Sequence, residues 1–372
     1  MAYVYSSGLN RGRRGRHDKQ KRARLMLLLL DLVMFCIMAM LIFATLTVII
    51  CQYVTPVKSG VLSTLSLGAP VIYLLDVLMV FYWIVRWRWS LTLAMLVMVL
   101  LGLFYLSRYY KIDLDRQYPT KYRERSYTKI MTYNVHEGKK EGFVEFITAH
   151  NPDILCVQEM TIGCDNWKEL NNTYKTTYKP NVAKGGNQIL TKYKIVNSGG
   201  IGDLPRRTAT WADLKISIDT VRVVSLHLQS TAIRHEDTEF LEGHQYFTDD
   251  ERNSKLHSIV GRLAENNKKR AEQAKLVADF LAETPYKVIV CGDFNDVPLS
   301  YTYRTIAKNL DDTFSEKAVG FAYTFNTKYR LLRIDNILVS PSIEVASYGV
   351  DNKIELSDHY PVISRVKIRT KK

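Results

Sequence analysis

The stretch VIVCGDFNDVP, residues 288–298, decides how this chain is interpreted. Its first three residues are β-branched and apolar, which predicts a buried strand. Asp293 and Asn295 follow where that strand would end, and Pro298 closes the segment. Because Asp, Asn and Pro are ordinary turn residues, a plain turn is the first interpretation. Whether the acid and the amide do more than end the strand depends on the other strands.

The region around this stretch predicts an α+β domain. We expect strands over residues 126–135, 153–159, 187–196, 208–217, 220–229, 287–296, 331–340 and 357–368. A long helical region is predicted over about 253–283. Strands dominate, so packed sheets with a few helices are expected. The polar region 231–268 interrupts this pattern and is interpreted as an insertion or a lid.

Nearly every predicted strand carries an acid, amide or imidazole at or near one end. These residues are Asn134, Gln158, Glu159, His227, Asp293, Asn295, Asp335, Ser357, Asp358 and His359. Each alone is explained as a turn residue or a satisfied histidine. Together at one rim, their carboxylates would repel one another unless a cation joined them. Oxygen donors suit Mg²⁺, and histidines without thiols fit acid–base or phosphate chemistry better than zinc. The pattern favours metal-assisted phosphoester hydrolysis.

Six segments, in this order, resemble motifs of the endonuclease/exonuclease/phosphatase (DNase I-like) superfamily. They are MTYNV (131–135), VQEM (157–160), SLHL (225–228), CGDFNDVP (291–298), RIDNILVS (333–340) and LSDHYPV (356–362). The resemblance covers about residues 127–370. It implies a four-layered α/β/β/α sandwich, with a catalytic domain over 127–372.

The resemblance also implies roles for the first four site residues. Asn134 and Glu159 would be metal residues, with Glu159 the principal ligand of Mg²⁺ or of Mn²⁺ as a substitute. Asp293 would orient or deprotonate the attacking water. Asn295 would hold a phosphate oxygen.

The remaining roles concern the two histidines. His359 would contact the scissile phosphate or act as a base, with Asp358 or Asp335 orienting its ring or helping to bind metal. His227 resembles a second histidine that assists the leaving group in the nuclease, sphingomyelinase and phosphatase branches. This residue argues against the abasic-site endonucleases, which tend to place a tyrosine there.

Two positions depart from the family pattern. The segment GGNQIL (185–190) replaces the family's GxAIL, so we treat Asn187 only as a candidate phosphate contact. Asn336 stands where the family usually has an aromatic residue, which predicts an altered pocket wall.

The N-terminal third of the chain indicates a membrane anchor. The net charge of +14 is concentrated partly in a basic arm, residues 1–24, so it argues poorly for nucleic-acid binding. Apolar stretches at about 25–50, 61–85 and 90–107 predict three transmembrane helices. Asp76 lies within the second of them, where packing against a neighbouring helix is the expected explanation.

The charges of the loops predict the orientation. The arm and the RWRW segment, residues 86–89, are basic, which places both in the cytoplasm. Three crossings then place the catalytic domain on the extracytoplasmic side, after a linker over 108–126. With two crossings the domain would instead be cytoplasmic.

We therefore expect a membrane-anchored, metal-dependent phosphoesterase or nuclease. The substrate is nucleic acid or a phospholipid headgroup, and the lipid bilayer is the other partner; the sequence indicates no protein partner. The alternatives are a sphingomyelinase-like phospholipid phosphodiesterase, a phosphatase of the same fold, and a non-catalytic binding scaffold. The scaffold is disfavoured because every motif residue is present.

Overall fold

The chain forms two compact units in the computed structural model. Described are residues 5–111, 127–177, 186–231, 237, 240, 248–326 and 330–368, with side chains from residue 19 onward, Phe104 excepted. The helical unit comprises Met1–Leu46 and Val71–Gly102, and the sheet unit comprises Thr47–Pro70 and Leu103–Lys372. The sheet unit therefore includes the segment between the first two apolar helices.

The helical unit is built from three helices, α1 (Tyr5–Cys51), α3 (Ala69–Val85) and α4 (Trp89–Leu106). Among the described residues, two stretches are long and apolar enough to cross a membrane, Lys19–Cys51 and Pro56–Val85. The third apolar helix is shorter, Trp89–Leu103. The prediction of three spans is thus corrected to two candidate spans plus a shorter apolar helix. The side of the membrane on which the domain lies stays a prediction.

Two acids of the helical unit, Asp31 and Asp76, accept hydrogen bonds from side chains elsewhere in the unit. Asp31 accepts hydrogen bonds from Arg86 Nε at 2.7 Å, Arg86 Nη2 at 2.9 Å and Tyr82 Oη at 2.9 Å. Asp76 is fully buried and accepts from Thr45 Oγ1 at 2.6 Å. Asp76 therefore packs against a neighbouring helix, as expected from the sequence.

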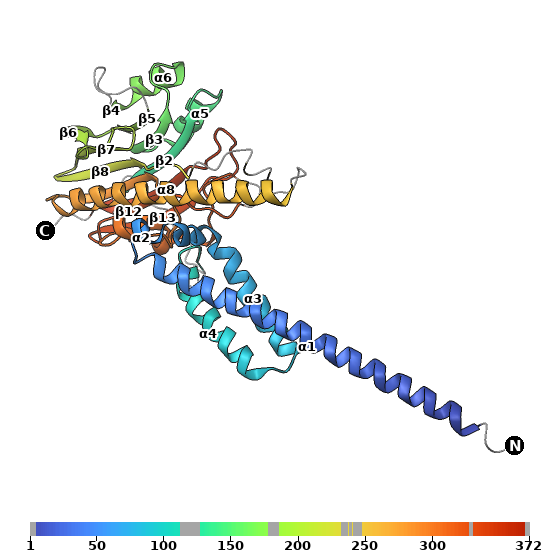
Figure 1. The fold of residues 1–372 in the computed structure, drawn as a ribbon. Helices are drawn as coiled ribbons and strands as arrows, with labels where there is room; N and C mark the ends of the chain where they lie inside the picture. The colour runs from blue at the N-terminus through green and yellow to red at the C-terminus, as the bar shows by residue number, and fades with distance from the viewer. Residues whose placement is uncertain are drawn as a thin grey trace. The chain divides into compact units, whose positions relative to one another are not determined.

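The sheet unit contains two six-stranded sheets (Figure 1). The first sheet has the order β13 (Ile343–Val350), β14 (Val362–Ile368), β2 (Thr128–Glu137), β3 (Ile154–Met160), β5 (Gly186–Thr191) and β4 (Lys175–Thr176). The second has the order β10 (Asp311–Asp312), β12 (Asp335–Val339), β9 (Lys287–Asp293), β8 (Asp219–His227), β7 (Ala209–Ile216) and β6 (Lys194–Gly200). The α+β class predicted from the sequence is confirmed.

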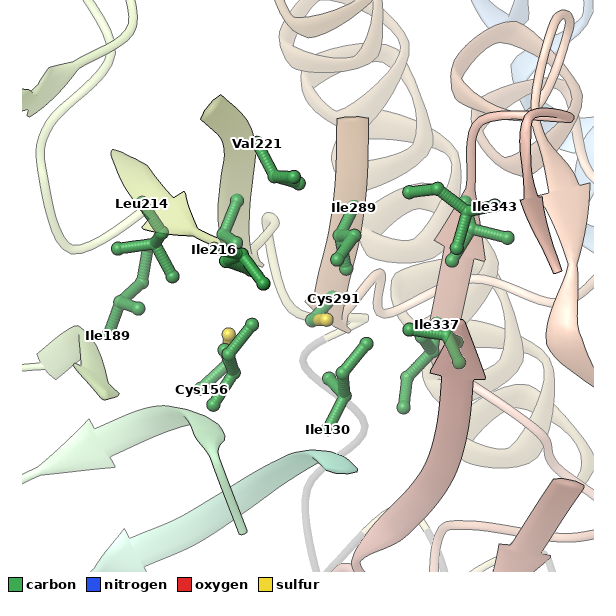
Figure 2. Close-up of a cluster of buried hydrophobic side chains, with 14 of the residues drawn as sticks. Ile130, Cys156, Ile189, Leu214, Ile216, Val221, Ile289, Cys291, Ile337 and Ile343 are labelled. Carbon is green, nitrogen blue, oxygen red and sulfur yellow. The ribbon is translucent and has the colours of Figure 1, made fainter. Parts of the chain in front are cut away.

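Apolar side chains from the two sheets meet between them (Figure 2). The first sheet contributes Ile130, Cys156, Ile189 and Ile343, and the second contributes Leu214, Ile216, Val221, Ile289, Cys291 and Ile337. Alternate residues of a strand point to opposite faces, so the residues next to these in the sequence point to the outer faces of the sheets. The two cysteines are free thiols in this core.

Helices pack against the outer faces of both sheets. On the first sheet, α5 (Phe143–His150) and α6 (Asp165–Thr173) pack against Met131, Tyr133, Leu155 and Val157. On the second, α8 (Asp249–Ala282) and α9 (Tyr301–Ile306) pack against Val224, Leu226, Val288 and Val290. The start of α8 is fixed by a capping box formed by Thr248 and Glu251. The predicted helix at 253–283 is confirmed with an earlier start.

One predicted strand is wrong. The stretch 187–196 is two strands, β5 and β6, which belong to different sheets and are joined through Lys192 and Tyr193. Tyr193 N donates to Thr191 Oγ1 at 3.1 Å, which helps to close the turn without Gly, Pro or Asn. The sequence therefore lacks the usual turn residues at this point.

Residues next to the apolar helices belong to the sheet unit. Segment 47–70 contains α2 (Pro56–Ser63) and the 3₁₀ helix η1 (Thr64–Gly68), which occupy the first part of the predicted second span. Further along, β1 (Tyr110–Lys111) pairs with β11 (Gly320–Phe321), and Arg108 Nη1 donates to Pro298 O at 3.1 Å. The first four residues of the predicted linker 108–126 are thus docked on the sheet unit, and the rest lies outside the described residues.

A buried ionic cluster, the Arg333 cluster, joins this docked segment to the second sheet. It consists of Tyr303, Asp312, Arg333 and Asn336. Arg333 Nη2 lies 2.8 Å from Asp312 Oδ2 and donates to Arg108 O at 3.1 Å, while Nη1 donates to Asn336 Oδ1 at 2.8 Å. Tyr303 Oη donates to Asp312 Oδ2 at 2.6 Å. The side chain of Asn336 is therefore engaged in this cluster and does not form the altered pocket wall that the sequence predicted. The short helix α10 (Thr313–Lys317) begins at the residue after Asp312.

Candidate active site

Five strand ends meet at one edge of the two facing sheets. β2 and β3 run parallel, as do β8 and β9, so Asn134, Glu159, His227 and Asp293 stand at or near the carboxyl ends of their strands. β12 runs antiparallel to β9 and begins with Asp335, directly opposite Asp293. The predicted gathering of polar residues at one rim is therefore present.

Asn134 connects the contributions of the two sheets. Its Nδ2 donates to Glu159 Oε1 at 3.1 Å and to Asp293 Oδ2 at 3.1 Å. Asn134 and Asp293 are buried, whereas the side chain of Glu159 is 38% exposed. Of these three residues, Glu159 is the one that solvent and a ligand can reach.

Asp293 and Asn295 form a closed turn at the end of β9. Asp293 Oδ1 accepts from Asn295 N at 2.7 Å, and Oδ2 accepts from Asn295 Nδ2 at 3.0 Å. Asn295 Nδ2 also donates to Leu228 O at 3.1 Å, which ties the turn to the end of β8. Asn295 and Glu159 have φ angles of 50° and 59°, in the left-handed region. Such backbone strain in non-glycine residues is concentrated at functional sites.

Gly292 allows β8 and β9 to approach each other here. Its φ is 135°, and a Cβ at this position would lie 2.0 Å from Leu226 O. The same pairing places His227 opposite Asp293. A glycine immediately before Asp293 is therefore required by the backbone.

Asp335 and His359 form a buried ion pair. Nδ1 of His359 donates to Asp335 Oδ2 at 2.9 Å, and Nε2 lies 3.8 Å from Asp293 Oδ2. Burial raises the pKa of Asp335 to about 6. Burial acts against a charged His359, but the charges of Asp335 and Asp293 outweigh it and raise the pKa of His359 to about 10. Of the two acids that the sequence left open for orienting His359, Asp335 makes the contact.

His227 lies against Glu159. His227 Nε2 is 3.3 Å from Glu159 Oε1 and 3.9 Å from Asp293 Oδ2. The hydrogen bond from His227, together with that from Asn134, lowers the pKa of Glu159 to about 2 although burial acts the other way. Burial would lower the pKa of His227, but its bond to Glu159 and the charge of Asp293 raise it. We call Glu159, His227, Asp293, Asp335 and His359 the site cluster.

Asp358 stands apart from the site cluster. Its side chain is 49% exposed, and its Oδ1 accepts from Ser357 Oγ at 3.1 Å. The imidazole Nδ1 of His136 lies 3.9 Å from Asp358 Oδ1 and 3.7 Å from Glu159 Oε2. The imidazole of His136 therefore lies near both the carboxylate of Glu159 and that of Asp358. His136 was not predicted from the sequence, although it lies two residues after Asn134.

Two further residues, Gln158 and Asn187, form buried hydrogen bonds that link the first sheet to Ser225 of the second. Gln158 Nε2 donates to Ser225 Oγ at 3.1 Å and to Thr132 Oγ1 at 3.2 Å. Ser225 Oγ donates to Asn187 Oδ1 at 2.5 Å, and Asn187 Nδ2 donates to Ser225 O at 2.7 Å. Asn187 is fully buried with its amide engaged, so it does not form the phosphate contact for which it was a candidate.

The carboxylate and amide oxygens at this edge fit a hard divalent cation. One carboxylate oxygen each of Asp293 and Asp335 and a ring nitrogen of His359 lie within 4.8 Å of one another, and of these the two oxygens can bind a cation while the imidazole carries its own charge. Asp335 Oδ1 is buried and has no hydrogen-bond partner among the described residues. A buried acceptor without a donor is costly, and a cation or an ordered water would satisfy it. Glu159 and Asn134 add an ionised carboxylate and an amide at the same edge.

Comparison with known proteins identifies two families in the chain. Residues 131–359 match the model of the Endonuclease/Exonuclease/phosphatase family. Residues 28–109 match a family described as "Domain of unknown function (DUF8431)". No curated protein matches the chain.

Many solved structures are similar to the sheet unit's fold. One is an endonuclease/exonuclease/phosphatase family protein from Bacteroides thetaiotaomicron, 18% identical over 64% of this chain and 94% of that one, with a TM-score of 0.45. The human Nocturnin catalytic domain is 19% identical over 65% of this chain and 94% of that one, with a TM-score of 0.45. The 3′ phosphatase NExo from Neisseria is 20% identical over 64% and 98%, with a TM-score of 0.47.

The family model extends from MTYNV, which contains Asn134, to His359 in LSDHYPV, and it covers more than half of the chain. It includes every residue of the site cluster. The chain therefore belongs to the Endonuclease/Exonuclease/phosphatase family, and it is a hydrolase that acts on phosphoester bonds.

Proposed function

We propose that the chain is a membrane-anchored, Mg²⁺-dependent phosphoesterase that hydrolyses phosphodiester bonds by attack of water. The observation that carries this proposal is the site cluster itself. Three carboxylates and two imidazoles from both sheets converge at one edge, linked by Asn134, and Glu159 is open to solvent. A binding scaffold has no need of such an arrangement.

Glu159 is the principal metal residue in this proposal, with Asn134 beside it. The lowered pKa of Glu159 keeps its carboxylate ionised at neutral pH, which is the form that binds Mg²⁺. Asp358 joins them as an outer ligand, next to His136. A bound Mg²⁺ would polarise the phosphoryl oxygen as a Lewis acid, and Mn²⁺ would substitute for it.

Asp293 and Asn295 act on the water and the phosphate. Asp293 is fixed by Asn134 and Asn295, so its carboxylate is held ready to orient and deprotonate a water molecule. Asn295 is the proposed contact to a phosphate oxygen, and its Nδ2 would exchange one of its two bonds, to Asp293 Oδ2 or to Leu228 O, for that contact. Asp293 is preorganised by these bonds, which is where most electrostatic catalysis arises.

The two histidines have different roles in this proposal. Asp335 fixes the ring of His359, and its raised pKa keeps the imidazole charged, so we assign it to a phosphate oxygen rather than to the base role. His227 has a raised pKa as well and can donate a proton to the leaving group.

Helices support both the membrane anchor and the layered arrangement. Apolar helices near the N-terminus support membrane anchoring, and the charges of the basic arm and of RWRW place both on the cytoplasmic side. An extracytoplasmic domain therefore requires the shorter apolar helix, Trp89–Leu103, to cross as well, since two crossings would leave the domain in the cytoplasm. Helices packed on the outer faces of both sheets support the four-layered α/β/β/α arrangement.

Two substrate classes are proposed, nucleic acid and a phospholipid headgroup. The anchor favours a substrate near the bilayer, and a phosphatase activity of the same site is the third possibility. The full-length protein in detergent, assayed side by side on plasmid DNA, RNA, sphingomyelin and an inositol phosphate, separates these classes.

The proposal is tested with the full chain and bis(p-nitrophenyl) phosphate in the presence of Mg²⁺. We expect Glu159→Gln to lose about a hundredfold or more of kcat/KM, because the principal metal carboxylate is removed. Glu137→Gln is the matched control: its carboxylate is exposed and pairs with Lys139. Undiminished activity in Glu159→Gln, or in excess EDTA, would refute the site assignment.

A further inference from the structure

Helix α2 packs on α8 through a stripe of small residues. Pro56, Gly60 and Ser63 are buried, while neighbouring Val61 is exposed. A Cβ at Gly60 would lie 3.3 Å from Lys268 Cε and 3.4 Å from both Ala264 Cβ and Ala264 O, so the two helices are closely packed at this point. Figure 1 shows α2 beside α8. The segment between the first two apolar helices is therefore held on the sheet unit by specific packing.

A polar contact continues from α2 into α8. Asn267 Nδ2 donates to Ser63 Oγ at 3.0 Å. The other amide atom, Asn267 Oδ1, accepts from Arg270 Nη2 one turn further along α8. Both Asn267 and Arg270 are buried. Because one amide makes both contacts, Ser63 fixes the orientation in which Asn267 meets Arg270.

Arg270 then contacts two of the segments that carry site residues, the one after β8 and the one after β9. Its Nη1 donates to Gln229 O at 2.7 Å, two residues after His227. Its Nε lies 3.5 Å from Asp296 Oδ2, next to the Asp293–Asn295 turn. Gln273 supports the same point, since its Oε1 accepts from Gln229 N at 2.8 Å. Asp296 is thus the ion-pair partner of a buried arginine.

The guanidinium of Arg270 depends on these few contacts. It is fully buried, and its Nε makes no hydrogen bond among the described residues, since the ion pair with Asp296 is long. Its placement therefore relies on Gln229 and on Asn267. A buried charge with few partners is sensitive to the loss of any one of them.

We propose that Ser63, Asn267 and Arg270 are positioning residues of the active site, through which the segment between the first two apolar helices sets the placement of His227 and of the Asp293–Asn295 turn. The inference rests on the proposed function and deepens it: the anchor contributes to the geometry of the site besides localising it. A fragment that begins in the linker lacks α2 and this contact.

The test compares three variants of the full-length protein in detergent. Ser63→Ala removes the acceptor for Asn267, and Ser63→Thr restores a hydroxyl. Thr64→Ala is the matched control, because Ser63 Oγ and Thr64 Oγ1 each donate to a carbonyl three residues back, Gly60 O and Val61 O, and the bond of Thr64 is exposed. Each variant is measured for kcat and KM on bis(p-nitrophenyl) phosphate below its melting temperature. Amide hydrogen exchange is followed in peptides covering 228–231 and 293–298.

For Ser63→Ala we expect kcat to fall about threefold to tenfold, the effect of one lost hydrogen bond, with KM nearly unchanged. Exchange in both peptides should become faster by a similar factor. Ser63→Thr should recover both quantities, and Thr64→Ala should resemble the wild type.

The outcomes separate this inference from the proposed function. If Ser63→Ala lowers only the melting temperature, and leaves kcat and both peptides unchanged, the positioning role is refuted and the hydrolase stands. If the wild type shows no Mg²⁺-dependent activity, the proposed function fails. Hydrogen exchange still decides the coupling in that case, because it needs no substrate: faster exchange supports the inference and unchanged exchange refutes it.

Discussion

Two ionic clusters share strand β12, which carries Asp335 of one and Asn336 of the other, and they differ in their cations. The acid of the Arg333 cluster is paired with a guanidinium, which stays charged at any accessible pH. The acids of the site cluster are paired with imidazoles, which can gain and lose protons. Arg333 directs both terminal nitrogens at buried acceptors and leaves only Nε unpaired among the described residues, whereas the site cluster leaves the acceptor Asp335 Oδ1 unpaired and Glu159 open to solvent.

The difference separates a structural from a functional use of buried charge. A guanidinium packed among acceptors of fixed position anchors the docked segment at Arg108 to the second sheet. Imidazoles and carboxylates with spare capacity can bind a cation, a phosphate and a proton in turn. Substitutions in the Arg333 cluster should therefore cost stability, and those in the site cluster should cost activity.

The largest effect is expected for His359→Gln. Glutamine can still donate to Asp335 but cannot carry the charge placed beside the phosphate. We expect kcat/KM to fall about 10²-fold to 10⁴-fold, with a smaller loss of melting temperature than in Arg333→Met, because Asp335, whose pKa is already raised by burial to about 6, can take up a proton once its charged partner is removed. Parallel activity and thermal unfolding measurements check this. A melting temperature that falls as far as that of Arg333→Met would break the distinction between the clusters.

The next largest effect is expected for Arg333→Met, which leaves the buried Asp312 without its cation. We expect a loss of about 3–5 kcal/mol from the free energy of unfolding of the sheet unit, measured by urea titration in detergent. Folded protein recovered at low temperature should keep its activity. Arg330→Met, at an exposed position, is the control, and an equal midpoint for the two variants would contradict the structural role.

A smaller effect is expected for Tyr303→Phe. The hydroxyl donates to the charged Asp312 inside the cluster, so its removal should cost about 1.5–3 kcal/mol in the same titration. Tyr301→Phe, on a half-buried residue of the same helix, should change little. Tyr303→Phe should leave kcat/KM unchanged, and a fall comparable to that of His359→Gln would show that the two clusters act as one.

The sequence predicted that polar residues gather at one edge because strand ends are local features. Glu159 and Asp293 were proposed because each follows an apolar run, and parallel strands place such ends at one edge. The partner of His359 could not be predicted, since Asp358 is adjacent in sequence while Asp335 is brought near by the pairing of β12 with β9. His136 was missed because its nearness to Glu159 depends on the pairing of β2 with β3.

The packing of α2 against α8 could not be predicted from hydropathy. A stripe of Pro56, Gly60 and Ser63 reads equally well as a lipid-facing or a protein-facing surface. Only the tertiary contact with Ala264 and Asn267 decides between them. The same limit applies to β13, a strand that the sequence analysis did not predict and that is defined by its pairing with β14.

Gly292 constrains how this protein can vary. Any other amino acid would place a carbon atom inside the backbone of Leu226, and the strain could be relieved only by separating β8 from β9. That separation would move His227 away from Asp293, so a single methyl group added outside the catalytic side chains would dismantle their spacing. In a library of random variants, position 292 should tolerate almost no substitution.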